Sequence, residues 1–209
     1  MDRMAASPPP TMAAETERGR AKSERYDALR REAARLFAEH GFDGVSLEDI
    51  GAAVGISGPG VYRHFTSKRA LLGAIMLHAS EDLLDSGREV LEADADAVTH
   101  LRSLVDFHVD FAVRCADLIR VHDRDLSRLS DDDRHRVRLL QREYVDLWTS
   151  VLTRLHPGRG DDEHRVRAHA GFGLINSTSH SMSARRDASP DAAVRRILAD
   201  MAVAALLAP

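Results

Sequence analysis

The chain lacks helix-breaking residues over most of its middle. No proline lies between Pro59 and Pro157, and from Gly60 to Pro157 the only further glycines are Gly73 and Gly87. A stretch with so few turn residues offers few places for hairpins, and no segment alternates β-branched with polar residues as a half-buried strand would. The pattern favours long helices with short connections, and we expect an all-α fold.

Apolar periodicity and the remaining breaks divide the chain into three parts. Residues 1–22 have no apolar period and are rich in Ala, Pro, Glu and Thr, so they are expected to form a disordered arm. Residues 23–70 and 71–209 are expected to form two helical domains. Helices are expected over residues 23–39, 46–54, 58–65, 66–93, 97–115, 117–129, 131–155, 162–182 and 190–207.

Composition narrows the classes of protein. The 209 residues suffice for one or two domains, and Cys115 is the only cysteine, which excludes an intrachain disulfide or a cysteine-based zinc site. No apolar run approaches the ~18 residues of a membrane-spanning helix, and residues 1–11 do not resemble a secretory signal, so a cytoplasmic location is expected. The net charge of −4 gives no general reason to expect a nucleic-acid partner.

The region from residue 41 to residue 72 has the organisation of a helix-turn-helix. Ser46 with Asp49 makes an N-capping pattern, the tripeptide 55–57 makes a tight turn, and Pro59 falls in the first turn of a second short helix. The first helix of such a pair braces the second, which fits the major groove of DNA. Between residues 56 and 80 there are three basic residues and no acidic one, so the acidic average hides a local basic surface.

These residues resemble a known family. The segments GVSLEDIGAAVGIS (44–57), VYRHF (61–65) and SKRALL (67–72), preceded by ARLF (34–37) and GF (41–42), are similar to the TetR family of bacterial transcriptional regulators. The similarity covers roughly residues 26–77. It implies an N-terminal helix-turn-helix DNA-binding domain and a C-terminal helical domain for ligand binding and dimerisation. The implied partners are double-stranded operator DNA, a small-molecule effector and a second copy of the chain.

The resemblance assigns DNA contacts residue by residue. It places Tyr62, His64 and Lys68 on phosphates, and two helix-start serines on the DNA backbone. The three residues nearest the base edges include two glycines, so direct base contacts would be few. Specificity would then depend on Arg63, on DNA shape and on residues 18–22 entering a minor groove. The full set of expected DNA contacts is Ser46, Ser57, Gly58, Pro59, Gly60, Tyr62, Arg63, His64 and Lys68. The alternative is an ordinary helical bundle in which these aromatic residues are core.

The second domain carries aromatic and polar residues at helical spacing that could line an effector pocket. His108 falls on an apolar face, Tyr144 and Trp148 share one helix face, and Phe172 lies one turn from Asn176. The expected effector-binding set is Phe107, His108, Phe111, Tyr144, Trp148, Phe172 and Asn176. Core packing and a hydrogen-bonded core histidine are the alternatives.

Arginines concentrate in the segments 121–126, 134–138 and 141–144. They resemble those of TetR-type regulators that sense acyl-CoA or fatty-acid metabolites, and such a protein could act as an activator or dual regulator. The favoured alternative is a solvated helix face, on which Glu143 and Asp146 offset the repulsion between Arg138 and Arg142.

The last two helices are the expected dimer interface. Small residues recur at close-packing intervals in Ala170, Gly173, Ser177 and Ser181, and residues 201–207 form an apolar run. The histidine spacings lack metal-binding patterns and no phosphate-binding loop follows a strand, so we expect neither metal, cofactor nor catalysis. The sequence as a whole predicts a ligand-responsive regulator, a homodimeric repressor released from a pseudo-palindromic operator.

The charge is divided unevenly between the two halves of the chain. Residues 1–80 hold 11 basic and 10 acidic residues, whereas residues 81–209 hold 18 and 23. The first half is therefore net +1 and the second net −5. A polyanion is expected to bind the first half.

Overall fold

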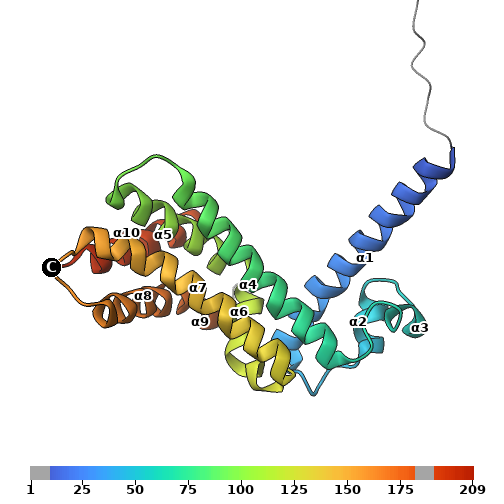
Figure 1. Ribbon diagram of the computed structural model, residues 1–209. Coiled ribbons are helices and arrows are strands. Elements are labelled where there is room, and N and C mark those ends of the chain that lie inside the picture. Colours follow the sequence, from blue (N-terminus) through green and yellow to red (C-terminus); the bar gives the residue numbers. More distant parts are fainter. Residues whose placement is uncertain (1–9, 182–190) are drawn as a thin grey trace, which may run out of the picture.

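The computed structural model describes residues 10–181 and 191–209, and every regular element in these ranges is helical. Figure 1 shows an N-terminal head at one end of an elongated helical body. The head contains α1 (Pro10–His40), α2 (Leu47–Ala53) and α3 (Gly58–Val61). The all-α prediction is confirmed.

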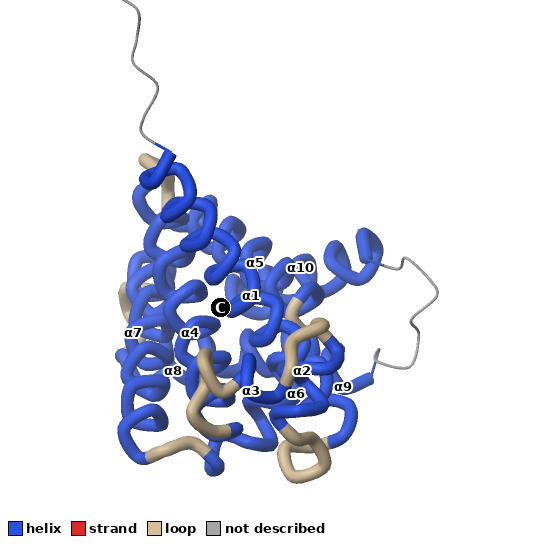
Figure 2. The backbone as a smooth tube through the Cα atoms, turned by 90° about the vertical axis from the view of Figure 1, so that its right-hand side faces the viewer, coloured by secondary structure: helices blue, strands red, loops and turns tan. Residues whose placement is uncertain are grey.

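The body follows from α4 onward, and its helices pack along one another as Figure 2 shows. Its longest helices, α4 and α7, are in contact along their length. The buried interior includes Trp148, Leu104 and Leu152, none of which is exposed. The elements are α4 (Lys68–Glu92), α5 (Ala97–Arg114), α6 (Ala116–Asp125), the 3₁₀ turn η1 (Leu126–Arg128), α7 (Asp131–Leu155), α8 (Asp161–Asn176), α9 (Thr178–Ser181) and α10 (Asp191–Leu207).

The head has its own small core. Phe37 of α1, Ile50 of α2 and Val61 of α3 are fully buried together with Leu72 from the first turns of α4. These apolar contacts hold the two short helices α2 and α3, which would be marginal alone, against α1 and α4. Because α4 runs without a break across residue 70, the expected domain boundary falls inside a helix that serves both cores.

The first helix is longer than expected. The structure differs from the disordered arm predicted for residues 1–22, since α1 already begins at Pro10; residues 1–9 lie outside the described residues. Residues 11–22 are mostly Ala, Glu, Arg and other good helix formers, so propensity favours the helix without an apolar stripe. The stripe is missing because this part of α1 points away from the rest of the molecule (Figure 1).

Two other boundaries differ. The helix expected over 162–182 ends at Asn176, where a turn separates α8 from the short α9. The helix expected over 58–65 is α-helical only to Val61. Two glycines and a proline in its four residues give this segment poor helix propensity. The polar run 183–189 lies outside the described residues.

Candidate DNA interface and ligand cavity

The turn between α2 and α3 is built from glycines. Gly55 has φ +71°, a left-handed conformation that disfavours side chains. A Cβ on Gly51 would lie 2.4 Å from Val61 Cγ2 and 2.8 Å from the Ile56 carbonyl oxygen, so α2 and α3 approach too closely for any other residue. The sequence therefore fixes the position of α3 against its bracing helix.

The start of α3 matches the expected N-cap at Ser57, although its hydroxyl caps no backbone amide. Gly60 is required by packing, since a Cβ there would lie 2.7 Å from Ile56 Cγ2, whereas Gly58 has ordinary space. Beyond Val61 the chain continues as turns, in which the amide of His64 donates to the Val61 carbonyl at 2.8 Å. These turns carry the side chains expected at DNA.

The phenol of Tyr62 and the guanidinium of Arg63 are exposed on this surface. Tyr62 is 50% exposed, and its hydroxyl donates to Glu48 Oε1 at 3.0 Å. The bond to this carboxylate, the largest influence, raises the pKa of Tyr62. Arg63 is exposed and makes no ion pair within the described residues. The surface offers a free guanidinium and a phenol already held by an acid.

Other expected contacts also hold the head together. Lys68 Nζ donates to the Val45 carbonyl at 2.7 Å and lies 4.6 Å from the centre of the Phe42 ring. The Ser46 hydroxyl accepts from the Asp49 amide at 3.0 Å and donates to the Asp49 carboxylate at 2.6 Å. Because these groups have structural partners, their contacts with DNA would be additional to a structural role.

The helix α1 brings cations to this surface, among them Lys22 of the segment 18–22 expected to enter a minor groove. His64 is half-buried with its ring 6.5 Å from that of Tyr26, and its pKa is lowered by burial and then by the nearby cations Lys22 and Arg25. Lys22 and Arg25 lie near His64 because of the direction in which α1 runs. The sequence segment 56–80 contains no acidic residue, but the packing of α2 against α3 places Glu48 beside Tyr62. This acidic neighbour was not expected from the segment alone.

A cavity of about 330 Å³ lies within the body, between helices α4 to α8. Five of the seven expected effector residues line it, namely His108, Phe111, Tyr144, Phe172 and Asn176. Phe107 packs against the core instead. Trp148 lies behind the wall, fully buried, with its ring centre 4.9 Å from that of Phe172.

The sequence reasoning missed the part of the wall that α4 and α6 contribute. Most of these residues are small or aliphatic, a type that helix periodicity assigns to any core, whereas His122 and Asp123 of α6 are polar. The lining residues not expected are Met76, Ala79, Ser80, Leu83, Leu118, Ile119, His122, Asp123, Gln141, Val145 and His169.

One end of the cavity is polar. His108 Nδ1 lies 3.1 Å from the Tyr144 hydroxyl, while His108 Nε2 and Asn176 Oδ1 are buried without a hydrogen-bond partner among the described residues. Burial lowers the pKa of His108 to about 4, so the imidazole is neutral at physiological pH. Burial also raises the pKa of Tyr144. Buried atoms without partners carry a free-energy cost that a polar ligand group would relieve.

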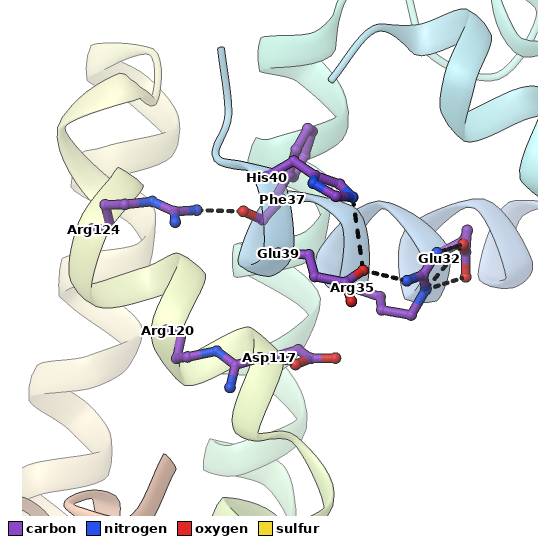
Figure 3. Close-up of polar contacts among 8 residues, drawn as sticks. All are labelled: Glu32, Arg35, Phe37, Glu39, His40, Asp117, Arg120 and Arg124. Carbon is purple, nitrogen blue, oxygen red and sulfur yellow. Dashed lines mark hydrogen bonds and ion pairs between the residues drawn. The ribbon is translucent and has the colours of Figure 1, made fainter. Parts of the chain in front are cut away.

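The helix α6 connects this cavity to the head (Figure 3). Arg124 Nη2 donates to the Phe37 carbonyl at 2.5 Å, close to the end of α1. Arg128 Nη2 in η1 pairs with Asp43 at 2.6 Å. On its other side α6 contributes four cavity residues. The same short helix thus contacts both functional regions.

The outer faces of α8 and α10 expose apolar side chains. Val166 is 67% exposed, Ile197 52% and Met201 53%. Ala170 and Gly173, two of the small residues expected at an interface, are also exposed, whereas the Ser181 side chain is outside the described ones. The helices α8 and α10 pack against each other, so these exposed side chains are carried by two neighbouring helices.

Two family models match the chain. The model for bacterial regulatory proteins of the tetR family matches residues 29–75, and the model for the tetracyclin repressor-like C-terminal domain matches residues 94–206. The chain belongs to the TetR family. The expected membership and the division into a helix-turn-helix head and a helical C-terminal domain are confirmed.

Individual relatives extend this result. The HTH-type transcriptional repressor KstR2 of Rhodococcus jostii is 29% identical over 63% of this chain and 65% of its own length. The HTH-type transcriptional activator FasR of Mycolicibacterium smegmatis is 29% identical over 43% of this chain and 41% of its own. The matches span less than two thirds of either relative. A TetR-family regulator from Bordetella parapertussis superposes with TM-score 0.75 and 28% identity, over 87% of this chain and 93% of that one.

Two features are absent from residues 10–181 and 191–209. No helix there combines the length and apolar character needed to cross a membrane. No group of three or more histidine, cysteine or acidic side chains in those ranges could hold a metal ion.

Proposed function

We propose that this TetR-family chain is a DNA-binding transcriptional regulator, a homodimeric repressor that acts in the cytoplasm and leaves its operator when an effector binds. The observation that carries the DNA-binding part is the exposed surface of α3 and the following turns. There Arg63 is unpaired and Tyr62 is exposed, beside Lys22 and Arg25 of α1. Phosphate contacts from such a surface would supply most of the affinity.

The test of DNA binding is selection of an operator from random duplex DNA by the full chain. Arg63→Gln should weaken binding and reduce the salt slope by about one, because one phosphate or base contact is lost. Arg102→Gln, an exposed arginine on α5 of the body, is the matched control. Selection of no sequence, or equal loss in both variants, would contradict the proposal.

Dimerisation is proposed through α8 and α10. A single helix-turn-helix reads too few base pairs, and paired heads must reach half-sites about one DNA turn apart. The exposed Val166, Ile197 and Met201 are the apolar groups that a second copy would cover. These contacts give a self-complementary four-helix interface.

The dimer is tested by sedimentation of the purified chain. The double change Ile197→Asp with Met201→Asp should convert a dimer to monomers and abolish operator binding. Leu139→Asp, which places the same charge on an exposed apolar residue of α7, should leave the dimer intact. A wild-type monomer would remove the proposed interface.

The effector is proposed to occupy the cavity and to act on the head through α6. His122 Nε2 lies 2.6 Å from Gln141 Nε2, and this pair at the cavity wall joins α6 to α7. A ligand that moves these residues would shift α6 and so the Arg124 contact with the end of α1. The position of the heads would change, and the population would shift to a form that does not fit the operator.

The effector proposal is tested by screening metabolites for release of the selected operator. Ala79→Phe would fill part of the cavity and should abolish release while operator affinity stays unchanged. Ala93→Phe, at an exposed position at the end of α4 and away from the cavity, is the control and should leave release unchanged. Release that is unaffected by Ala79→Phe would place the effector elsewhere.

We propose repression because KstR2, whose match covers more of this chain, is a repressor. FasR, whose match covers less of it, is an activator. A reporter gene behind the selected operator decides between them. Expression should rise when the chain is deleted; a fall would identify an activator, the alternative function.

A further inference from the structure

The walls of the cavity carry almost no formal charge. Among the described residues that line it there is no lysine or arginine, and its one acidic lining residue, Asp123, has a side chain that is 51% exposed. An anion that entered this cavity would lose its hydration without gaining a cation as a partner, at a large cost in free energy. The volume of about 330 Å³ lies near the lower end of the range for ligand pockets, which is about 300–1,000 Å³. The walls therefore favour a small ligand without charge.

Three polar side chains determine which nitrogen of His108 carries the proton. His108 Nδ1 lies 3.1 Å from the Tyr144 hydroxyl and is the acceptor that this hydroxyl has within the described residues. Burial raises the pKa of Tyr144, and the Trp148 indole opposes this rise, so the indole N–H is directed at the Tyr144 oxygen. Because an indole can only donate, the phenolic proton points to His108 Nδ1. The neutral imidazole therefore carries its own proton on Nε2.

The next two atoms of this polar series have no partner. His108 Nε2 and Asn176 Oδ1 are buried and form no hydrogen bond within residues 10–181 and 191–209. Both side chains line the cavity. Burial lowers the pKa of His108 and Asn176 opposes this lowering, so the amide oxygen lies close to the imidazole. A donor, the Nε2–H group, and an acceptor, Oδ1, thus lie near each other at the cavity wall.

A hydroxyl group is the ligand group that satisfies both atoms at once. It can accept from the Nε2–H group of His108 and donate to Oδ1 of Asn176. Ethers, ketones and carboxylates can only accept, and an ammonium group can only donate. Each of these would leave one of the two buried atoms unpartnered, and an unpartnered buried atom costs its full desolvation free energy.

We propose that the effector is an uncharged, mainly apolar alcohol or phenol whose hydroxyl lies between His108 and Asn176. Its apolar part would contact the rings of Phe111 and Phe172, which line the same cavity. This inference rests on the proposed effector role of the cavity and names the chemical class of ligand.

The experiment compares two isomers that differ in the hydroxyl group. 1-Octanol and heptyl methyl ether are titrated into the full chain, with octanoate as the anionic probe and octylammonium as the cationic probe. Trp148, the only tryptophan, reports binding by its fluorescence, because its ring centre lies 4.9 Å from that of the cavity residue Phe172. 1-Octanol should bind about tenfold more tightly than each of the other three probes. Equal affinity for the two isomers, tighter binding of either ion, or binding of none would overturn the inference.

Variants locate the hydroxyl group. Asn176→Leu removes the acceptor at similar volume, so it should reduce the affinity for 1-octanol to that for the ether and leave the affinity for the ether unchanged. Ser80→Ala is the matched control, because the Ser80 hydroxyl also lies in the cavity wall but already donates to the Met76 carbonyl at 2.8 Å. The preference for the alcohol should survive in Ser80→Ala, and its survival in Asn176→Leu would overturn the inference.

Nuclear magnetic resonance tests the position of the proton directly. The nitrogen chemical shifts of His108, assigned by their loss in His108→Asn, should show the proton on Nε2. A proton on Nδ1 would overturn the inference, because Nε2 and Asn176 Oδ1 would then both be acceptors.

Operator binding and its release by metabolites are measured in parallel, which separates this inference from the proposed function. Release by a metabolite without a hydroxyl group, blocked by Ala79→Phe, would leave the proposed function intact and overturn the inference. A chain that selects no operator would contradict the proposed function, whereas the preference for 1-octanol is measured by Trp148 fluorescence without DNA.

Discussion

The head and the body solve opposite problems. The head holds the short helices α2 and α3 on a small core and leaves the side chains expected at DNA on the outside, where Tyr62 and Arg63 are exposed. The body buries its aromatic groups around a cavity, where polar atoms of His108 and Asn176 have no hydrogen-bond partner within residues 10–181 and 191–209. A surface that binds a large polyanion needs exposed charge, whereas a site for a small ligand needs enclosure and unsatisfied groups.

The difference predicts where substitutions act. Changes inside the body, away from the proposed dimer face, should affect stability or ligand response and leave operator affinity intact, and changes at the tight contacts of the head should do the reverse. The described connections between the two include α4, which contributes to both cores, the α6 contact with the end of α1, the ion pair of Arg128 with Asp43, and Leu129 and Val137, which are buried in the head's core. Each prediction below separates the two regions or shows that they are coupled.

The largest effect is expected from Trp148→Ala. This side chain is fully buried and packs on Phe172 and His108, so its removal should cost roughly 3–5 kcal/mol of unfolding free energy. Chemical denaturation followed by circular dichroism measures this loss. Operator affinity at low temperature should remain, because no contact of Trp148 reaches the head; a parallel loss of affinity would show that the regions are not separable.

The next effect concerns pH. The folded pKa of His108, about 4, lies below the ordinary value of 6.5, so between these values the unfolded chain binds the additional proton. Stability contributed by the neutral imidazole is complete above pH 6.5 and is lost progressively down to about pH 4, in all about 3 kcal/mol. Denaturation of His108→Asn across this range should show a shallower pH dependence than wild type. His78→Asn, at an exposed histidine of α4, is the control and should keep the full slope.

A smaller effect, confined to the head, is expected from Gly51→Ala. The added Cβ would clash with Val61 and the Ile56 carbonyl, and such overpacking costs about 1–3 kcal/mol. Because the clash displaces α3, operator binding should fall more than stability. Gly158→Ala, which has open space, is the control. Normal operator affinity in Gly51→Ala would mean that the placement of α3 is adjustable.

The fold class could be predicted from the sequence because helix-breaking residues and helix caps are local features of the chain. The absence of prolines from 60 to 156 predicted long helices, and Ser46 with Asp49 predicted a capping box that the structure contains. The early start of α1 was missed because helix propensity alone, without an apolar stripe, extends it to Pro10. A window of apolar periodicity cannot detect a helix that packs on nothing.

The site was less accessible to sequence reasoning because it depends on which helices meet. Aromatic and polar residues on α5, α7 and α8 identified five of the sixteen residues that line the cavity, but Ala79 and Ile119 are indistinguishable in sequence from ordinary core. The acids that were expected to compensate Arg138 pair with partners on other helices, at Arg88 and Arg165. Spacing within one helix predicts possible pairs, and tertiary packing decides which of them form.

The smallest predicted effect tests Glu48, the acidic group bonded to Tyr62 on the proposed DNA surface. Glu48 holds the Tyr62 hydroxyl at 3.0 Å, so DNA binding must break this bond and bring phosphates toward a carboxylate. Glu48→Gln keeps a hydrogen-bond acceptor but removes the charge, and it should tighten operator binding roughly two- to five-fold and act mainly on the association rate. Glu92→Gln, an exposed acid at the far end of α4, removes the same charge without touching the head. If both variants tighten binding equally, only the total charge matters; if Glu48→Gln alone does, the balance between Glu48 and phosphate at Tyr62 is part of how the head releases its operator.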